Sequence, residues 1–155
     1  MLVNTRHFGE IDLEENKIIY FEHGILGFED CKEYTILYDE QDGNRPEISW
    51  LQSLDEVSLA IPVVSPGLVK QDYNPNVDDE LLKPLGELTE ENLVVLVSVT
   101  VPVDVTKISA NLKAPFIINA DTRRAVQIIT EGTEHEVKHY FYHRLMENKA
   151  AKGDK

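Results

Sequence analysis

The sequence predicts a mainly β protein, folded as one compact antiparallel barrel-like or sandwich domain with one short helix near residues 78–85. Three observations predict this class. Short runs rich in β-branched and aromatic residues recur along the chain, with turn-forming residues between them. The longest apolar run, LVVLVSVTV, is too β-branched to favour a helix. At 155 residues and 42% apolar content, the chain is long enough for one hydrophobic core and short for two.

The first four predicted strands lie in the N-terminal part of the chain. Turn formers separate them, in the segments HGILG, DEQDGN and SPG. Short strands at this near-regular spacing are typical of a small barrel or sandwich. The four runs are Lys17–Phe21 (KIIYF), Tyr34–Tyr38 (YTILY), Ile48–Leu51 (ISWL) and Leu59–Val64 (LAIPVV).

The segment DDELLKPLGELTEEN, residues 78–92, carries the helix signals of the chain. Asp78 or Asp79 can cap its start, since a carboxylate there accepts a hydrogen bond from the first turn. Pro84 and Gly86 end it early, so the predicted helix is short.

The remaining strands follow this helix. The run Leu93–Val101 is predicted as a central strand buried on both faces. Two more strands, Phe116–Asn119 (FIIN) and Ala125–Thr130 (AVQIIT), are joined by ADTRR, which favours a hairpin connection. We expect a single domain over residues 1–148 and a flexible polar tail over 149–155.

Charge is placed unevenly along the chain. Lys and Arg total 15 against 28 Asp and Glu, for a formal net charge of -13. Residues 1–56 hold 14 acidic and four basic side chains, whereas residues 101–155 hold seven acidic and nine basic. The acidic first third would repel phosphates, so we expect no direct nucleic-acid binding. The same field would speed the encounter with a basic protein; the alternative is that the acid only keeps the surface soluble.

Cysteine content and hydropathy limit the environment of the protein. Cys31 is the only cysteine, which excludes an internal disulfide and a multi-thiolate metal site. The N-terminus has no apolar signal region, and no apolar run is long enough to span a membrane. We therefore expect a soluble, cytoplasmic protein with no membrane partner and no cofactor.

The segment HEVKHYFYH, residues 135–143, raises the question of a zinc site. His135, Glu136 and His139 spell HExxH, which on a helix places two imidazoles on zinc and a carboxylate beside its water. On a strand, at about 3.3 Å per residue, the two histidines would lie about 13 Å apart and could not share a metal. Valine and aromatic residues favour the strand, with one face formed by Val137, His139, Phe141, His143 and Leu145. A small zinc-dependent hydrolase is the alternative function, whereas we expect no metal, no enzymatic activity and no small-molecule substrate.

Three stretches resemble the flagellar assembly factor FliW family. They are FEHGILGFEDCKEY (21–34), ISWLQSLDEVSLAIPVVSP (48–66) and VSVTVPVDVTKISANLKAPFIINADTRRAVQII (97–129). The matching positions occur in the family's order and approximate spacing: Gly24, Gly27, Phe28, Glu29, Leu51, Gln52, Ser53, Asn111, Leu112, Ala114, Pro115, Asn119 and Gln127. The resemblance covers nearly the whole chain. It is weak over residues 70–92 and absent in the tail ENKAAKGDK.

The resemblance implies a non-enzymatic, cytoplasmic regulator of flagellar assembly. FliW-like proteins bind flagellin, the filament subunit, and also CsrA, a small RNA-binding repressor of flagellin translation. Accumulated flagellin holds FliW and leaves CsrA free to stop translation, and export of flagellin releases FliW to antagonise CsrA. This antagonism acts away from the RNA site of CsrA. The family's fold is a compact, mainly β barrel-like domain, in agreement with the strand pattern.

The segment GILGFED is the candidate contact with a partner. A tight loop between its two glycines would present apolar side chains ringed by carboxylates, so that charge speeds encounter and the apolar groups give affinity. The alternative is that Leu26 and Phe28 plug one end of the barrel, because large buried aromatics are commoner than exposed ones. The candidate partner-binding residues are Glu22, Ile25, Leu26, Phe28, Glu29, Asp30, Gln52, Asn111 and Lys113.

Two further motifs complete the candidate set. The first two residues of WLQS are expected in the core, while Gln52 pairs its amide with backbone at a strand edge. In NLKAP, Asn111 is expected to take a left-handed conformation in a turn, with Pro115 starting the next strand and Lys113 facing solvent.

Overall fold

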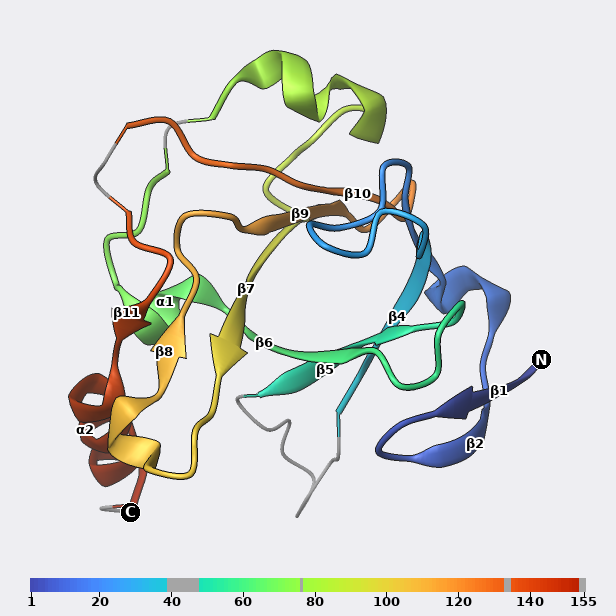
Figure 1. Cartoon of the computed structure of the whole chain (residues 1–155). Coiled ribbons are helices and arrows are strands. Elements are labelled where there is room, and N and C mark those ends of the chain that lie inside the picture. Colours follow the sequence, from blue (N-terminus) through green and yellow to red (C-terminus); the bar gives the residue numbers. More distant parts are fainter. Residues whose placement is uncertain (39–47, 76, 133–134, 154–155) are drawn as a thin grey trace.

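The structure, a computed structural model, describes residues 1–38, 48–75, 77–132 and 135–153, with side chains up to residue 147 (Figure 1). The predicted turn DEQDGN, residues 39–44, lies outside the described residues.

Seven strands close into a barrel, which confirms the mainly β, barrel-like prediction (Figure 1). Neighbouring strands are antiparallel except β10 and β3, which run parallel. Pairing of β7 with β9, with Val94 opposite Ile118, closes the circle. The barrel strands are β3 (Ile19–Phe21), β4 (Glu33–Leu37), β5 (Ser49–Ser53), β6 (Ala60–Val64), β7 (Leu93–Thr100), β9 (Phe116–Asn119) and β10 (Arg124–Gln127).

Strand β7 occupies the central position predicted for it, but it is not buried on both faces along its length. Its first half pairs with β9, its middle with β6, and its last two residues with β8 (Ser109–Ala110). Leu93 is 43% exposed and Thr100 is also exposed, whereas Val97 is fully buried. Thr100 is exposed where the strand leaves the barrel and pairs on one side only, with β8, which β11 (His139–Tyr140) extends.

Two strands near the N-terminus form a separate antiparallel hairpin that the sequence did not predict. β1 (Leu2–Thr5) pairs with β2 (Gly9–Asp12), and the hairpin lies beside the barrel near β4 and β5 (Figure 1). Its tip is fixed to the barrel by Arg6, whose backbone N–H donates to Gln52 Oε1 at 3.0 Å. The imidazole of His7 stacks on the indole of Trp50 at 4.0 Å between ring centroids. Trp50 is therefore only half-buried, in correction of its predicted core position, whereas Leu51 is fully buried as predicted.

The predicted short helix is present as the 3-10 helix η2 (Asp79–Leu85). Asp78 caps it, because its side chain accepts from the backbone N–H of Glu80 at 3.0 Å. Gly86 ends it with a φ of 86°. The other short helices are η1 (Glu15–Lys17), α1 (Pro66–Val69) and η3 (Val105–Lys107).

The C-terminal strand predicted across residues 137–145 is wrong except at β11, because helix α2 (Tyr142–Gly153) begins directly after it. Phe141 and Leu145, four residues apart, are both buried in one apolar cluster with α1. This spacing places two apolar side chains on one face of a helix. Arg144 holds α2 against α1 by donating to the carbonyls of Leu68 and Gly67. The flexibility expected for residues 149–155 stays a prediction.

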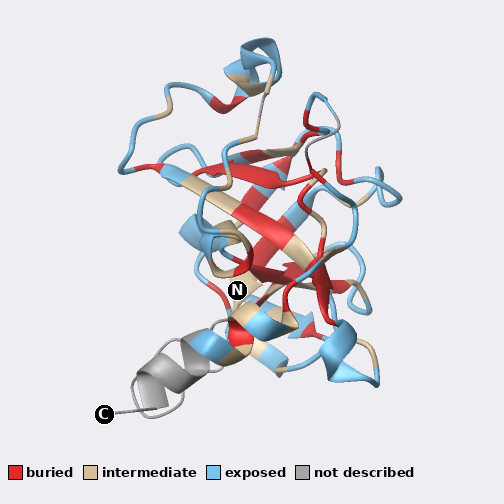
Figure 2. Ribbon diagram, turned by 90° about the vertical axis from the view of Figure 1, so that its left-hand side faces the viewer, coloured by how far each residue is buried: buried red, intermediate tan, exposed pale blue. Residues whose placement is uncertain are grey.

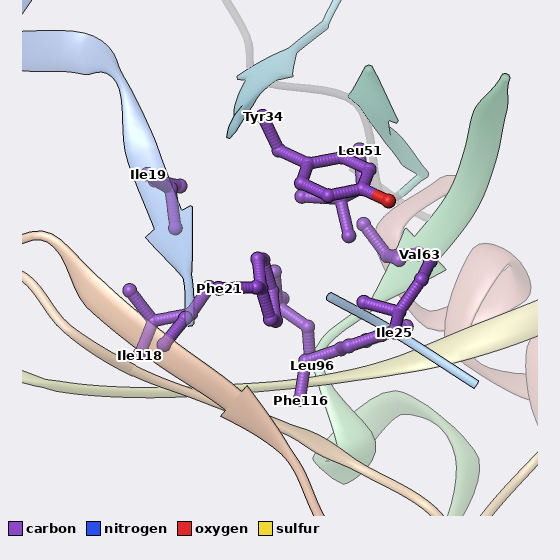
Figure 3. Close-up of a cluster of buried hydrophobic side chains, with 10 residues drawn as sticks. Ile19, Phe21, Ile25, Tyr34, Leu51, Val63, Leu96, Phe116 and Ile118 are labelled. Atoms are coloured by element: carbon purple, nitrogen blue, oxygen red, sulfur yellow. The ribbon is translucent and has the colours of Figure 1, made fainter. Parts of the chain in front are cut away.

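The barrel interior holds the main core (Figures 2 and 3). Phe21 is its centre, with its ring edge-on to Tyr34 at 5.2 Å and to Phe116 at 5.9 Å between centroids. Buried residues concentrate on the barrel strands, and exposed residues on the connecting loops (Figure 2). The buried members are Ile19, Phe21, Ile25, Tyr34, Leu51, Val63, Leu96, Phe116, Ile118 and Ala125.

The hydroxyl of Tyr34 is buried without a hydrogen-bond partner among the described residues. Burial raises the pKa of Tyr34 well above its usual range, so the group stays neutral. Because an unpaired buried hydroxyl costs free energy, Tyr34→Phe is expected to leave the free energy of unfolding unchanged or raise it by about 1 kcal/mol. Tyr73→Phe is the matched control: it deletes a hydroxyl that donates to the carbonyl of Leu112 at 2.6 Å. That control should lower stability by about 1 kcal/mol in urea denaturation, and a loss in both variants would contradict the assignment.

Candidate protein-binding site

The segment between β3 and β4, residues 22–32 and called here the β3–β4 loop, is a tight double turn. The backbone N–H of Phe28 donates to the carbonyl of Ile25 at 2.8 Å, which closes a four-residue turn. Gly27 is the third residue of this turn and has a φ of 86°, as a type II turn requires. A second turn follows, in which Cys31 N–H donates to the carbonyl of Phe28 at 3.1 Å.

Gly24 lets the loop fold back on itself. Its φ is 66°, and a Cβ built at this position would lie 2.5 Å from the backbone oxygen of Glu29. Any side chain here would meet the main chain of residue 29. Glycine is therefore needed both for conformation and for space, which gives the GILGFED motif a physical reason.

Two contacts from distant parts of the sequence hold the loop in place. Gln127 of β10 accepts from the backbone N–H of Leu26 at 2.8 Å and donates to the carbonyl of Ala114 at 3.1 Å. Asp55, in the β5–β6 connection, accepts from the backbone N–H groups of Lys32 and Glu33 at 2.8 and 3.0 Å. The loop lies beside β10 accordingly (Figure 1). These anchors fix both the tip and the end of the loop.

The loop exposes apolar side chains together with carboxylates. Leu26 is 54% exposed and Phe28 is 46% exposed. Neither side chain plugs the end of the barrel. The structure therefore shows the first of the two placements considered from the sequence, in which both are exposed. Three carboxylates on the same loop are exposed with them: Glu22, Glu29 and Asp30. This combination of apolar and acidic groups makes the loop a candidate for contact with another macromolecule.

Two candidate residues lie in the interior instead. Ile25 is 3% exposed and joins the barrel core, because the turn directs it inward while Leu26 points outward. Gln52 is 1% exposed; its amide donates to the carbonyls of Ser53 and Val57, which confirms the predicted pairing with backbone. Their side chains support the surface but are not part of it.

The polar side chains of the NLKAP turn make hydrogen bonds within the protein. Asn111 does not adopt a left-handed conformation; its side-chain oxygen instead accepts from the backbone N–H groups of Lys113 and Ala114 at 3.0 and 3.1 Å. Lys113 is partly buried rather than fully solvent-facing, since its ammonium donates to the carbonyl of Gly132. Pro115 precedes β9 as predicted. The structure therefore groups Glu22, Leu26, Phe28, Glu29 and Asp30, and leaves Asn111 and Lys113 in a separate turn.

Sequence reasoning did not find Asp55, Gln127 or Ile129 as parts of this site. The first two are anchors, and their contacts span 23 and 101 residues. Ile129 is 56% exposed and follows Gln127 by two positions in an extended segment, so it faces the same side as the loop anchor. The sequence holds no signal for Ile129, because it follows an identical residue, Ile128, that is buried.

The HEVKH segment lacks the helical geometry on which a two-histidine zinc site depends. His139 lies in strand β11, and the helix begins only at Tyr142. His135 is buried with its ring edge-on to Tyr73 at 4.7 Å. Within the described ranges, no group of three or more His, Cys, Asp or Glu residues could hold a metal ion. His139 instead pairs with Ala110 of β8, next to the start of α2.

No helix in the described part of the chain is long and apolar enough to cross a membrane. The fold and the loop together define a class of protein: a small closed β-barrel with an acidic loop on which two apolar side chains are exposed. The particular family follows from comparison with known proteins. The model of the FliW protein family matches residues 2–141, so the chain belongs to the FliW family.

Named relatives agree over almost the full length. The flagellar assembly factor FliW of Lachnoclostridium phytofermentans is 54% identical over 154 residues, covering 99% of this chain and 98% of that protein. That of Lachnospira eligens is 46% identical, covering 92% and 95%. A crystal structure of the flagellar assembly factor FliW superposes with a TM-score of 0.81 at 29% identity, covering 91% of this chain and 96% of that one. A role in flagellar assembly follows, and these relatives are named as assembly factors rather than as enzymes.

Proposed function

We propose that this chain is a non-enzymatic, cytoplasmic regulator that binds flagellin and CsrA alternately and thereby controls flagellin translation. Family membership supports the flagellar setting. The observation that carries the binding proposal is the exposure of Leu26 and Phe28 on a rigid loop with three exposed carboxylates. We expect no cofactor, no direct nucleic-acid contact and no small-molecule substrate for this role.

Charge and apolar contact contribute differently to the proposed complex with CsrA: charge to the association rate, and apolar contact to the affinity. An RNA-binding protein carries a positive face, and a partner with a net charge of -13 is steered towards it. Steering raises the association rate more than the affinity. Leu26 and Phe28 supply the apolar anchors that hold the complex once formed. Flagellin, when it accumulates, occupies the protein and leaves CsrA free.

The test is to mix the purified chain with CsrA and with flagellin, and to measure the mass of each mixture by light scattering. A stable complex is expected with each partner. Binding of CsrA should weaken as salt is raised from about 50 mM to about 500 mM, because exposed charges are screened beyond a few ångströms at high salt. The double variant Glu22→Gln with Asp30→Asn should flatten this dependence. Absence of both complexes would refute the function; salt-independent CsrA binding would refute only the electrostatic route.

A further inference from the structure

A cavity of about 530 Å³, open to solvent on one side, lies between the N-terminal hairpin and the barrel. Ile11, Asp12 and Leu13 form one side of it, and barrel strands form the other. No residue of the β3–β4 loop lines it. The cavity is therefore separate from the protein-binding loop. Its size falls within the range of small-molecule sites, which occur preferentially at places such as the mouths of β-barrels.

Aliphatic side chains form most of the cavity wall, with Asn16 and Thr35 as its uncharged polar members apart from Tyr38. Ile19 and Ile118 also belong to the barrel core, where they lie together on one side of the cluster (Figure 3). The cavity thus reaches the edge of the hydrophobic interior. Tyr38 is the single aromatic side chain among the described lining residues, so an aromatic ring would find no pair of rings to stack between. An aliphatic chain matches the wall, which includes Ile11, Leu13, Ile19, Ile36, Val94 and Ile118.

The charged groups around the cavity are biased towards positive. Lys17 and Arg123 line it, and neither makes an ion pair with any residue in the described ranges. The carboxylate of Asp12 is neutralised by the N-terminal ammonium of Met1 at 2.8 Å. Among the described residues, this leaves two cations without an ion-pair partner beside the cavity, in a protein of net charge -13. An anionic group on a ligand is the complementary partner.

Arg123 takes up this position at a conformational cost. Its φ is 61°, the one positive value for a residue other than glycine in the described part of the chain. Hydrogen bonds hold its backbone there: its N–H donates to the Asn119 carbonyl at 2.7 Å, and its own carbonyl accepts from Tyr20 at 2.8 Å. Glycine or asparagine would satisfy the turn with less strain. Such outliers concentrate at binding sites, and this one places a guanidinium at the cavity.

We propose that this cavity binds an aliphatic carboxylate of the medium-chain fatty acid class. The alkyl chain lies against the isoleucine and valine side chains, and the carboxylate is bound by Arg123 and Lys17. The fatty acid is proposed as a ligand only, and no chemical reaction is part of the proposal. The overall negative charge does not prevent binding, because at physiological salt charges more than about 8 Å away are largely screened. The proposal does not depend on the partners proposed above.

The probe is decanoate below its micellar concentration, titrated into the full chain by calorimetry. Saturable one-to-one binding is expected, with decyltrimethylammonium at least about tenfold weaker because it lacks the anionic head. Arg123→Gly should weaken decanoate binding about tenfold while keeping the fold, since a φ of 61° suits glycine. Arg124→Gln is the matched control, because Arg124 does not line this cavity and its loss should leave binding unchanged.

A second variant tests the place of binding independently of charge. Ala120 lines the cavity and is exposed, so Ala120→Phe should fill the space and abolish binding without disturbing the core. The proposal is overturned if decanoate does not bind, if the cationic amphiphile binds equally well, or if Arg123→Gly binds like the parent. Decanoate binding that survives Ala120→Phe would also overturn it, since the ligand would then lie elsewhere.

Discussion

Replacing Phe28 with serine is expected to weaken the complex with CsrA about 30-fold or more, since a central aromatic anchor contributes about 2 kcal/mol or more to an interface. Phe28 is 46% exposed at the centre of the acidic β3–β4 loop, so its ring is available to a partner without unfolding. The same half-exposure limits its part in stability, and the free energy of unfolding should change by no more than about 1 kcal/mol. Titration calorimetry gives the first quantity and urea denaturation the second.

Tyr140→Ser is the matched control for this result. Tyr140 is another large exposed aromatic side chain, at 60%, but it lies on β11, away from the β3–β4 loop (Figure 1). Its loss should leave CsrA binding unchanged. If both variants weaken binding equally, or if only Tyr140→Ser does, the loop is not the docking surface. If Phe28→Ser loses binding together with its cooperative unfolding transition, the effect is structural.

The barrel strands could be predicted because each carries its own signal. Runs such as YTILY and FIIN combine β-branched and aromatic residues with flanking turn formers, and they fall within one or two residues of β4 and β9. The N-terminal hairpin carries no such signal. Its two strands are only four residues long and mix apolar with polar residues, and the hairpin is held by contacts of Arg6 and His7 with residues more than 40 positions away. Local pattern cannot reveal an element whose position depends on such contacts.

The C-terminal segment shows tertiary packing overriding residue preference. The letters HYFYH favour a strand, yet only His139 and Tyr140 form one. Phe141 directly precedes α2, and its carbonyl accepts from the N–H of Leu145 at 3.0 Å, so that both side chains reach the cluster around α1 from the first helical turn. The sequence alone suggests a continuous strand with Phe141 and Leu145 on one face. In the structure β11 ends at Tyr140, so no strand carries these two side chains.

The β3–β4 loop was predictable in position but not in detail. Two glycines with acid beside them mark a tight turn, and both have the positive φ that explains them. The sequence cannot distinguish Ile25 from Leu26, which are chemically alike, yet one is 3% and the other 54% exposed. The orientation of the turn decides which of the two side chains is buried. This orientation depends on the hydrogen bond from the backbone N–H of Leu26 to Gln127, 101 residues away.

Gly24→Ala is expected to cause the largest loss of stability of any single change in the loop, about 3 kcal/mol. Two costs combine. Alanine must adopt a φ of 66°, and its Cβ would stand 2.5 Å from the oxygen of Glu29, a distance that real Cβ atoms do not show. Because the clashing atoms are backbone, the loop must move as a whole. Movement of residue 29 also displaces Phe28, so the CsrA complex should weaken beyond what partial unfolding explains.

Two other glycines separate these costs. Gly27 has a φ of 86° but nothing within 4 Å of a built Cβ, so Gly27→Ala should lose only about 1 kcal/mol, the conformational part. Gly67 has open space and no positive φ, so Gly67→Ala in α1 should be neutral or slightly stabilising. Urea denaturation of the three variants should therefore give the order Gly24→Ala, Gly27→Ala, Gly67→Ala, from least to most stable. Equal losses at residues 24 and 27 would mean that the loop does not fold back on itself as described, and the apolar pair at its tip would lose its rigid support.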